Sequence, residues 1–252
     1  MQMLLASAVL TNIRFPNMGI ELRNVPYGID VFGFHIAFYG IIIGFGMLCG
    51  WLIAEWMAKK TGQSRELYLD FALIAIIVSV IFTRLGYVLF SLDEFVDNPL
   101  EIFNLRSGGM MIYGGIFGAI LSAIIFCRVK KYSFWLLADT GCIGLVTGQM
   151  IGRWGNFFNR EVFGKFTDNI FAMQLNINDV TSEYQMSQTR LQEKFAGKES
   201  AFENIMEIRN NTVLMDGIVY IQVHPTFLYE SLWNLALLIL LIFYTKHKKF
   251  DG

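Results

Sequence analysis

The segment GRWGNFFNREVFG, residues 152–164, concentrates hydrogen-bonding side chains directly after a long apolar run. It places Arg153, Asn156, Asn159 and Glu161 among aromatic residues and glycines. A guanidinium group can grip a phosphodiester with paired donors, and neighbouring amides can orient the polar groups around it. These residue types therefore indicate a binding site for an anionic ligand.

Other polar residues lie near the ends of apolar segments. They are Tyr39, Arg84, Tyr113, His224, Tyr229 and Glu230. Tyrosines at a membrane interface commonly form the aromatic belt, and arginines such as Arg153 and Arg160 can extend to lipid headgroups. Arg84 is harder to explain in this way, because a charge that deep in a span costs on the order of 2.5–3.5 kcal/mol and needs an inward-facing partner. Glu161 and Glu230 are the carboxylates best placed to pair with the arginines.

The composition predicts that a bundle of membrane-spanning helices positions these residues. The chain has 252 residues, of which 54% are hydrophobic and only 16% are charged. Soluble domains have about 25% charged residues. The net charge is −1 and no basic stretch is interleaved with stacking aromatics, so we expect no nucleic-acid partner. The three cysteines lie in apolar segments without metal-ligand spacing, and we expect neither a disulfide nor a metal site.

Five segments have the roughly 20 apolar residues that a membrane-spanning helix needs. They are residues 34–55, 70–91, 109–128, 134–152 and 225–244. Small residues recur four apart inside them and let helix backbones approach closely in lipid. These pairs and triples are Gly40 and Gly44, Gly46 and Gly50, Gly114 and Gly118, and Gly144, Gly148 and Gly152. The fold class predicted is an all-α polytopic membrane protein, a bundle of five transmembrane helices with a small external α+β subdomain.

The charges of the short loops predict the orientation. Lysines and arginines follow the first and fifth spans and lie between the third and fourth, whereas the loop between the second and third is acidic. The positive-inside rule then places the N-terminus outside and the C-terminus in the cytoplasm. The first residues lack the basic start and cleavage site of a signal peptide, so we expect none to be removed.

The predicted domains are residues 1–164, containing the first four spans, an external segment 165–224, and residues 225–252 with the fifth span and a basic tail. The external segment contains helical stretches and a β-hairpin that turns at Asp216-Gly217. With this orientation the polar groups of all five spans reach the outer headgroup level. They predict a pocket for an anionic phospholipid that opens to the outer leaflet. From residue types alone, a lipid enzyme and a lipid-binding module remain equal alternatives.

Five ordered motifs resemble the prolipoprotein diacylglyceryl transferase family, which consists of bacterial membrane enzymes. The motifs are HIAFYG, TRLGYVLF, GGMMIYGGIFGA, GRWGNFFNREVFG and HPTFLYESLWN. The resemblance runs from about residue 33 to 244, except for much of the external segment. It implies transfer of the diacylglyceryl group of phosphatidylglycerol to the lipobox cysteine thiol in the signal peptide of a prolipoprotein. A thioether forms and glycerol phosphate leaves. The resemblance implies the bacterial cytoplasmic membrane and no metal or organic cofactor.

The same resemblance implies roles for residues of the longest motif. Arg153 would hold the phosphate and stabilise the charge that develops on the leaving group. Asn156 and Asn159 would orient the headgroup, while Glu161 would fix Arg153 or take part in proton movement. Gly164 would mark the turn into the external segment.

Further substrate-binding residues are implied by the other motifs. Tyr39 and Tyr229 would supply hydroxyl groups near the glycerol, Glu230 would support them, and Arg84 would line the same pocket. Tyr113 stands where the best-known members have a histidine. A phenol is a poor base at neutral pH. We therefore expect Tyr113 to hydrogen-bond the lipid at this catalytic position.

Family members continue into two further spans, the last of which bears another functional arginine. The sequence therefore predicts a C-terminally shortened chain that lacks part of the active-site wall. The alternative function is a non-catalytic membrane protein that binds anionic lipid or exported peptides. A small transporter is not favoured, because no discontinuous helix or midplane pair of polar groups is present.

Overall fold

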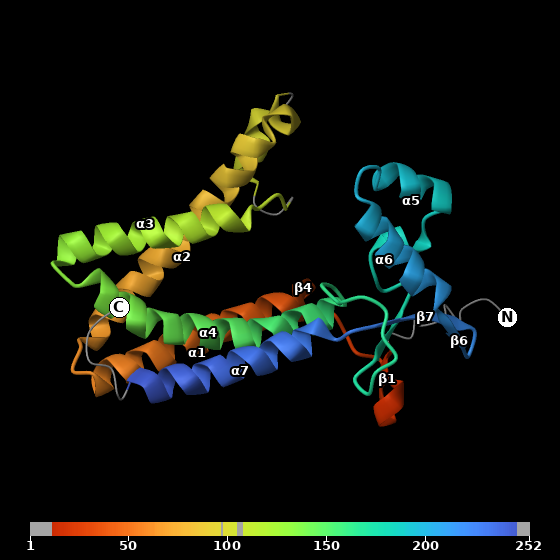
Figure 1. The fold of residues 1–252 in the computed structure, drawn as a ribbon. Coiled ribbons are helices and arrows are strands. Elements are labelled where there is room, and N and C mark those ends of the chain that lie inside the picture. The colour runs from red at the N-terminus through yellow and green to blue at the C-terminus, as the bar shows by residue number, and fades with distance from the viewer. Residues whose placement is uncertain (1–11, 97, 105–107, 246–252) are drawn as a thin grey trace. The chain divides into compact units, whose positions relative to one another are not determined.

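A computed structural model describes residues 12–96, 98–104 and 108–245 (Figure 1). In this part of the chain, five helices are long and apolar enough to cross a membrane. They are α1 (Phe38–Lys60), α2 (Arg65–Phe90), α3 (Ile112–Lys130), α4 (Phe134–Asn159) and α7 (Thr226–Thr245). The predicted five spans are confirmed, and the chain is a multi-pass membrane protein.

The span boundaries differ from those predicted by up to seven residues, and two of the differences lie at the candidate site. The first span begins at Phe38 instead of residue 34, because Phe34–Ala37 form strand β4. The fourth span was predicted to end at residue 152, but α4 continues to Asn159. Gly155 lets α4 pack closely there, since a Cβ atom at this position would lie 2.9 Å from the Tyr39 ring. Arg153, Asn156 and Asn159 of the motif therefore belong to the helix, beyond the predicted end of the span.

The chain forms two compact units. The first comprises residues 1–46 and 148–237, and the second comprises residues 47–147 and 238–252. Helices α1, α4 and α7 each contribute a segment to both units.

The first unit contains an antiparallel sheet of five strands in the order β2-β1-β5-β7-β6. Its strands are β1 (Ile13–Phe15), β2 (Ile20–Leu22), β5 (Met173–Asn176), β6 (Val213–Met215) and β7 (Ile218–Val223). The predicted hairpin is confirmed, because Asp216 and Gly217 both have positive φ, +52° and +76°, between β6 and β7. Positive φ at both central residues is the requirement of a type I′ turn. The N-terminal strands were not predicted to join this sheet.

The core of the first unit connects the sheet to the helix ends. Buried side chains of β1, β5 and β7 pack in one cluster with Phe157 of α4 and Phe227 of α7. Helix α6 (Glu199–Asn210) contributes Ile208 to this cluster, and α5 (Gln188–Lys194) precedes α6. These two helices confirm the helical stretches predicted in this segment. Short 3-10 turns lie at Pro16–Met18 and Ser182–Gln185. This core fixes the end of α4 against the start of α7.

The second unit shows why glycines recur in the spans. A Cβ atom at Gly114 of α3 would lie 2.2 Å from the carbonyl oxygen of Phe82 in α2. A Cβ atom at Gly144 of α4 would lie 2.5 Å from the carbonyl oxygen of Gly50 in α1. Close backbone approach at these glycines is therefore confirmed. Gly40 and Gly44, which belong to the first unit, have no neighbour within 4 Å of such an atom in the part of the chain that the structure describes.

Candidate functional site

Arg153 and Glu230 form an ion pair between α4 and α7 in the first unit. The Nη2 atom of Arg153 lies 2.6 Å from Oε2 of Glu230, and the two side chains are 37% and 41% exposed. The neighbouring Trp154 Nε1 donates to Ser231 Oγ, which itself donates to the Met150 carbonyl. These bonds hold the helices in register at the ion pair. The guanidinium group is therefore positioned by its surroundings and remains accessible to an anion.

Glu161 joins the two amides of the motif. Its Oε1 atom accepts hydrogen bonds from Asn156 Nδ2 at 3.1 Å and Asn159 Nδ2 at 3.2 Å. The sequence offered both Glu161 and Glu230 as partners for the arginines, and the structure pairs Glu230 with Arg153. Since both amide groups donate to one carboxylate, their carbonyl oxygens are held in fixed directions.

The backbone after α4 reverses sharply on either side of Glu161. Arg160 and Val162 have φ values of +50° and +53°, in a region that residues with a Cβ atom rarely adopt. The Glu161 N–H donates to the Asn156 carbonyl at 3.1 Å. A strained turn of this kind persists only when its surroundings hold it in place.

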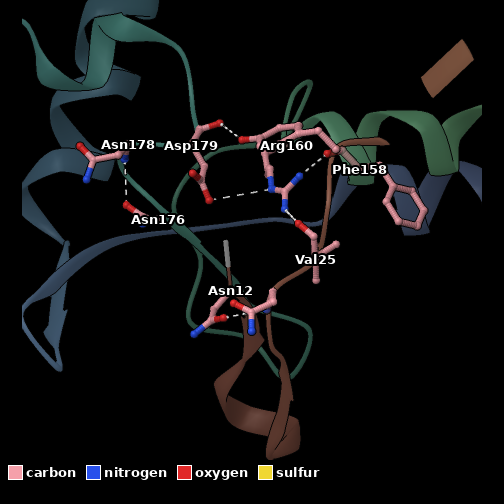
Figure 2. A network of polar contacts seen from close by, with 9 residues as sticks. Asn12, Val25, Phe158, Arg160, Asn176, Asn178 and Asp179 are labelled. Carbon is pink, nitrogen blue, oxygen red and sulfur yellow. Dashed lines mark hydrogen bonds and ion pairs between the residues drawn. The ribbon is translucent and has the colours of Figure 1, made fainter. Parts of the chain in front are cut away.

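The surroundings that hold this turn are gathered around Arg160 (Figure 2). Its guanidinium group donates to the carbonyls of Phe158 and Val25 and lies 3.9 Å from the centre of the Tyr27 ring. Asp179 follows β5 and lies 4.0 Å from Arg160 Nε. Because the Arg160 side chain is fully buried, its interpretation as a headgroup-seeking residue is wrong.

Burial dominates the electrostatics of this network. It lowers the pKa of the Arg160 guanidinium, and it raises the pKa of the Asp179 carboxyl more than the nearby Arg160 lowers it. Burial also raises the pKa of the Tyr27 hydroxyl. Among the residues that the structure describes, the Nε atom of Arg160 and the Oδ2 atom of Asp179 have no hydrogen-bond partner. The pair is thus a buried structural contact that lacks full hydrogen bonding.

Tyr229 lies in a second polar cluster, at the start of α7. Its hydroxyl group is 3.2 Å from His224 Nδ1 and accepts a hydrogen bond from Asn169 Nδ2 at 3.3 Å. The Gly164 N–H donates to the His224 carbonyl, and a Cβ atom at Gly164 would lie 2.8 Å from the His224 Cβ. Gly164 therefore makes room for His224. The sequence placed His224 among the polar residues at this level but assigned it no role, and it did not indicate Asn169.

Tyr39 is the second residue of α1 and is 37% exposed. Its ring packs where Gly155 leaves space, one residue before Asn156. The first unit thus contains eight of the predicted site residues. They are Tyr39, Arg153, Asn156, Asn159, Glu161, Gly164, Tyr229 and Glu230.

Arg84 belongs to the second unit and is only 5% exposed. Its donors bond the backbone carbonyls of Ile102, Gly108, Gly109 and Glu101, in the connection between α2 and α3. That connection includes the 3-10 turns Leu92–Phe95 and Pro99–Phe103. The expected carboxylate partner is therefore replaced by carbonyl oxygens. A direct contact between Arg84 and lipid stays a prediction.

Tyr113 also belongs to the second unit, in the first turn of α3, and is 72% exposed. In the part of the chain that the structure describes, no three His, Cys, Asp or Glu side chains are grouped as metal ligands.

Comparison with known proteins relates the sequence of this chain to one family. The family profile described as prolipoprotein diacylglyceryl transferase matches residues 26–252. The phosphatidylglycerol–prolipoprotein diacylglyceryl transferase of Bacillus cereus (strain 03BB102) is 36% identical over 209 residues. The protein of the same name from Bacillus mycoides (strain KBAB4) is 35% identical over 209 residues. Each alignment covers 83% of this chain but 66% of the relative, so the chain spans slightly less than two thirds of their length.

Proposed function

Because the chain belongs to the prolipoprotein diacylglyceryl transferase family, we propose that it transfers the diacylglyceryl group of phosphatidylglycerol to a prolipoprotein cysteine. The observation that carries this proposal is the accessible Arg153–Glu230 pair, which joins the longest motif of the resemblance to the motif HPTFLYESLWN. A positively charged, partly exposed group between two spans suits a lipid phosphate.

In the proposed reaction the cysteine sulfur attacks the glyceryl carbon that bears the phosphate. A carbon–sulfur bond forms, the carbon–oxygen bond to phosphate breaks, and glycerol phosphate departs with the electron pair. Arg153 donates to the phosphate and stabilises the charge that develops on it. A nearby guanidinium also favours the thiolate form of the incoming cysteine, whose proton is released to solvent or to a neighbouring base.

The other residues would orient the substrates. Asn156 and Asn159, held by Glu161, would direct their carbonyl oxygens to the glycerol hydroxyls of the headgroup. Tyr39 and Tyr229 would supply hydroxyl groups, while Gly164 keeps His224 against Tyr229. Glu230 would hold the guanidinium until the phosphate arrives.

From the same family membership we propose roles for two residues of the second unit, Tyr113 and Arg84. Tyr113 would hydrogen-bond the lipid through its exposed hydroxyl group without acting as a base. Arg84 would line the lipid pocket while it supports the connection between α2 and α3.

The proposed setting is the bacterial cytoplasmic membrane, with the N-terminus outside. The C-terminal end of this chain would lie in the cytoplasm, and the site would face the outer leaflet. There a lipobox cysteine becomes accessible after export of the precursor. The chemistry calls for no metal or organic cofactor, because the substrate supplies the nucleophile and the phosphate ester supplies the leaving group.

The test is mass spectrometry of a lipobox peptide incubated with the chain in vesicles that contain phosphatidylglycerol. A diacylglyceryl mass gain on the cysteine is expected, together with release of glycerol phosphate. A matched peptide with serine in place of cysteine should gain no mass. Binding of phosphatidylglycerol without any gain, in a correctly inserted chain, would support a lipid-binding protein instead.

A further inference from the structure

The two-stranded hairpin before α1 has one apolar face and one polar face. Strands β3 (Gly28–Val31) and β4 (Phe34–Ala37) pair so that Ile29 opposes Ile36 and Val31 opposes Phe34. Side chains alternate between the two faces of a strand, so these four apolar side chains share one face. On the opposite face Asp30 opposes His35, whose Nδ1 lies 3.0 Å from the carboxylate. The hairpin is therefore an amphipathic ribbon.

The apolar side of this hairpin is uncovered. Phe32, at the tip, is 98% exposed, and Phe34 is 75% exposed. Phe32 and Gly33 form the tight turn between the strands, and both have positive φ, +50° and +82°. A two-stranded hairpin without a covered apolar face is marginally stable in water. Side chains of this size at a tip indicate contact with an apolar medium.

The hairpin is joined to the membrane helix without a linker. Strand β4 ends at Ala37 and α1 begins at Phe38, whose N–H donates to the Tyr27 carbonyl at 2.8 Å. Four strand residues extend only about 13 Å at 3.3 Å per residue. The whole hairpin therefore stays close to the level at which α1 enters the hydrocarbon.

From these observations we infer that the β3–β4 hairpin lies in the membrane interface. Its apolar face and Phe32 tip enter the acyl region of the phospholipids, and the Asp30–His35 face remains in water. An amphipathic element binds at this depth because it buries apolar surface while its polar face stays hydrated. This contact would also fix the depth of Tyr39, two residues beyond the hairpin. The inference requires only that α1 spans the membrane and does not depend on the transferase reaction.

The test measures the depth of single spin labels in the full chain, reconstituted in vesicles of phosphatidylglycerol and phosphatidylcholine. Cys49, Cys127 and Cys142 are first replaced by alanine, and a nitroxide is attached after Phe32→Cys or Phe34→Cys. Asp30→Cys, on the polar face of the same hairpin, is the matched control. All three positions are exposed, so the labels do not disturb a packed core.

We expect collisions with oxygen to exceed those with a water-soluble nickel complex at positions 32 and 34. The ratio should reverse at position 30. Water accessibility at all three positions, in a chain whose α1 label at Ile41→Cys reports hydrocarbon, would overturn the inference. The same result with shielding only after addition of a lipobox peptide would also overturn it, and would make the hairpin a peptide-binding surface.

Discussion

The ion pair of Arg153 is too exposed to contribute much to stability. Exposed salt bridges typically contribute about 0–1 kcal/mol to the free energy of unfolding. The 2.6 Å contact with Glu230 nevertheless gives the guanidinium group one defined direction, and more than a third of its side chain remains accessible. The Arg153 guanidinium group therefore contributes little to the stability of the fold, but it has a defined position and is suited to binding a ligand.

Arg153→Ala should therefore remove activity and leave the fold intact. Loss of one preorganised donor to a developing charge costs about 10²–10³-fold in rate, and loss of a full cation at least as much. The measurement is the initial rate of peptide modification, with the unfolding temperature in detergent as the control. Near-wild-type rates would mean that Arg153 only contacts headgroups.

Arg160 is the contrasting case, because its charge is buried and its removal should affect stability. Arg160→Met would leave Asp179 in the interior without its cation, and breaking a buried pair in this way costs about 3–5 kcal/mol. Thermal unfolding of the purified chain should show a correspondingly lower midpoint. The matched control is Arg23→Met, since the Arg23 side chain is 76% exposed and should be silent. Equal midpoints for both variants would contradict the structural role.

At the scale of elements, helix packing depends on particular glycines and not on every small residue. Gly144 faces the backbone of α1 at a distance that no Cβ atom tolerates, whereas Gly141 on the same helix has open space. Gly144→Ala should therefore separate α4 from α1 and lower the unfolding temperature, and Gly141→Ala should not. The comparison is made by thermal denaturation in detergent. Equal effects would show that helix propensity, and not packing, determines the response.

The elements between α4 and α7 should show an acid dependence that comes from Glu183. Lys194 of α5 lies 2.6 Å from Glu183 in the preceding 3-10 turn, and this hydrogen bond, the largest cause, lowers the pKa of Glu183 from 4.5 to about 2 together with a bond from Thr181. A carboxyl group whose pKa is depressed by folding stabilises the folded state above its unfolded pKa. That contribution is lost as the pH falls from 4.5 to about 2.

Glu183→Gln should make the stability of the first unit less sensitive to pH in this window. The measurement is the urea midpoint between pH 5 and pH 2. Glu203→Gln, in α6, serves as a control for a general change of charge. An unchanged slope in Glu183→Gln would exclude this bond as the origin of the acid dependence.

At the scale of the whole molecule, the first unit is assembled from two stretches that are remote in the sequence, residues 1–46 and 148–237. Strand β1 pairs with β5, and Ile13 opposes Leu175 at the centre of the sheet. Ile13 is fully buried in the cluster that also contains Phe157 and Phe227. The sheet therefore connects the N-terminal segment to the helix ends that present the candidate site.

Ile13→Ala should therefore destabilise the candidate site, although Ile13 is remote from the site residues in the sequence. Truncating a buried isoleucine to alanine costs about 2–5 kcal/mol. The matched control is Ile20→Ala in the adjoining strand β2, where the side chain is 44% exposed. Limited proteolysis of the first unit would report the difference. If both variants resisted cleavage equally, the N-terminal strands would be dispensable to this unit.

The sequence by itself determined the membrane class, the five spans and the motif that carries the candidate site. Hydropathy and glycine spacing are local properties, and they were sufficient because lipid requires each span to satisfy its own backbone hydrogen bonds. It also located the hairpin turn at Asp216-Gly217, since positive φ is a requirement on single residues.

Only the tertiary structure decided which charges pair and which are buried. Residue types left Glu161 and Glu230 as alternative partners and the resemblance favoured Glu161 for Arg153, but in the structure Arg153 of α4 pairs with Glu230 of α7. Residue types also gave Arg153 and Arg160 the same interpretation, as side chains that extend to lipid headgroups. In the structure the strained turn after α4 directs Arg160 into the core, where it contacts Asp179 and Tyr27. The pairing of β1 with β5 joins residues that are remote in the chain, and no local pattern encodes such a contact.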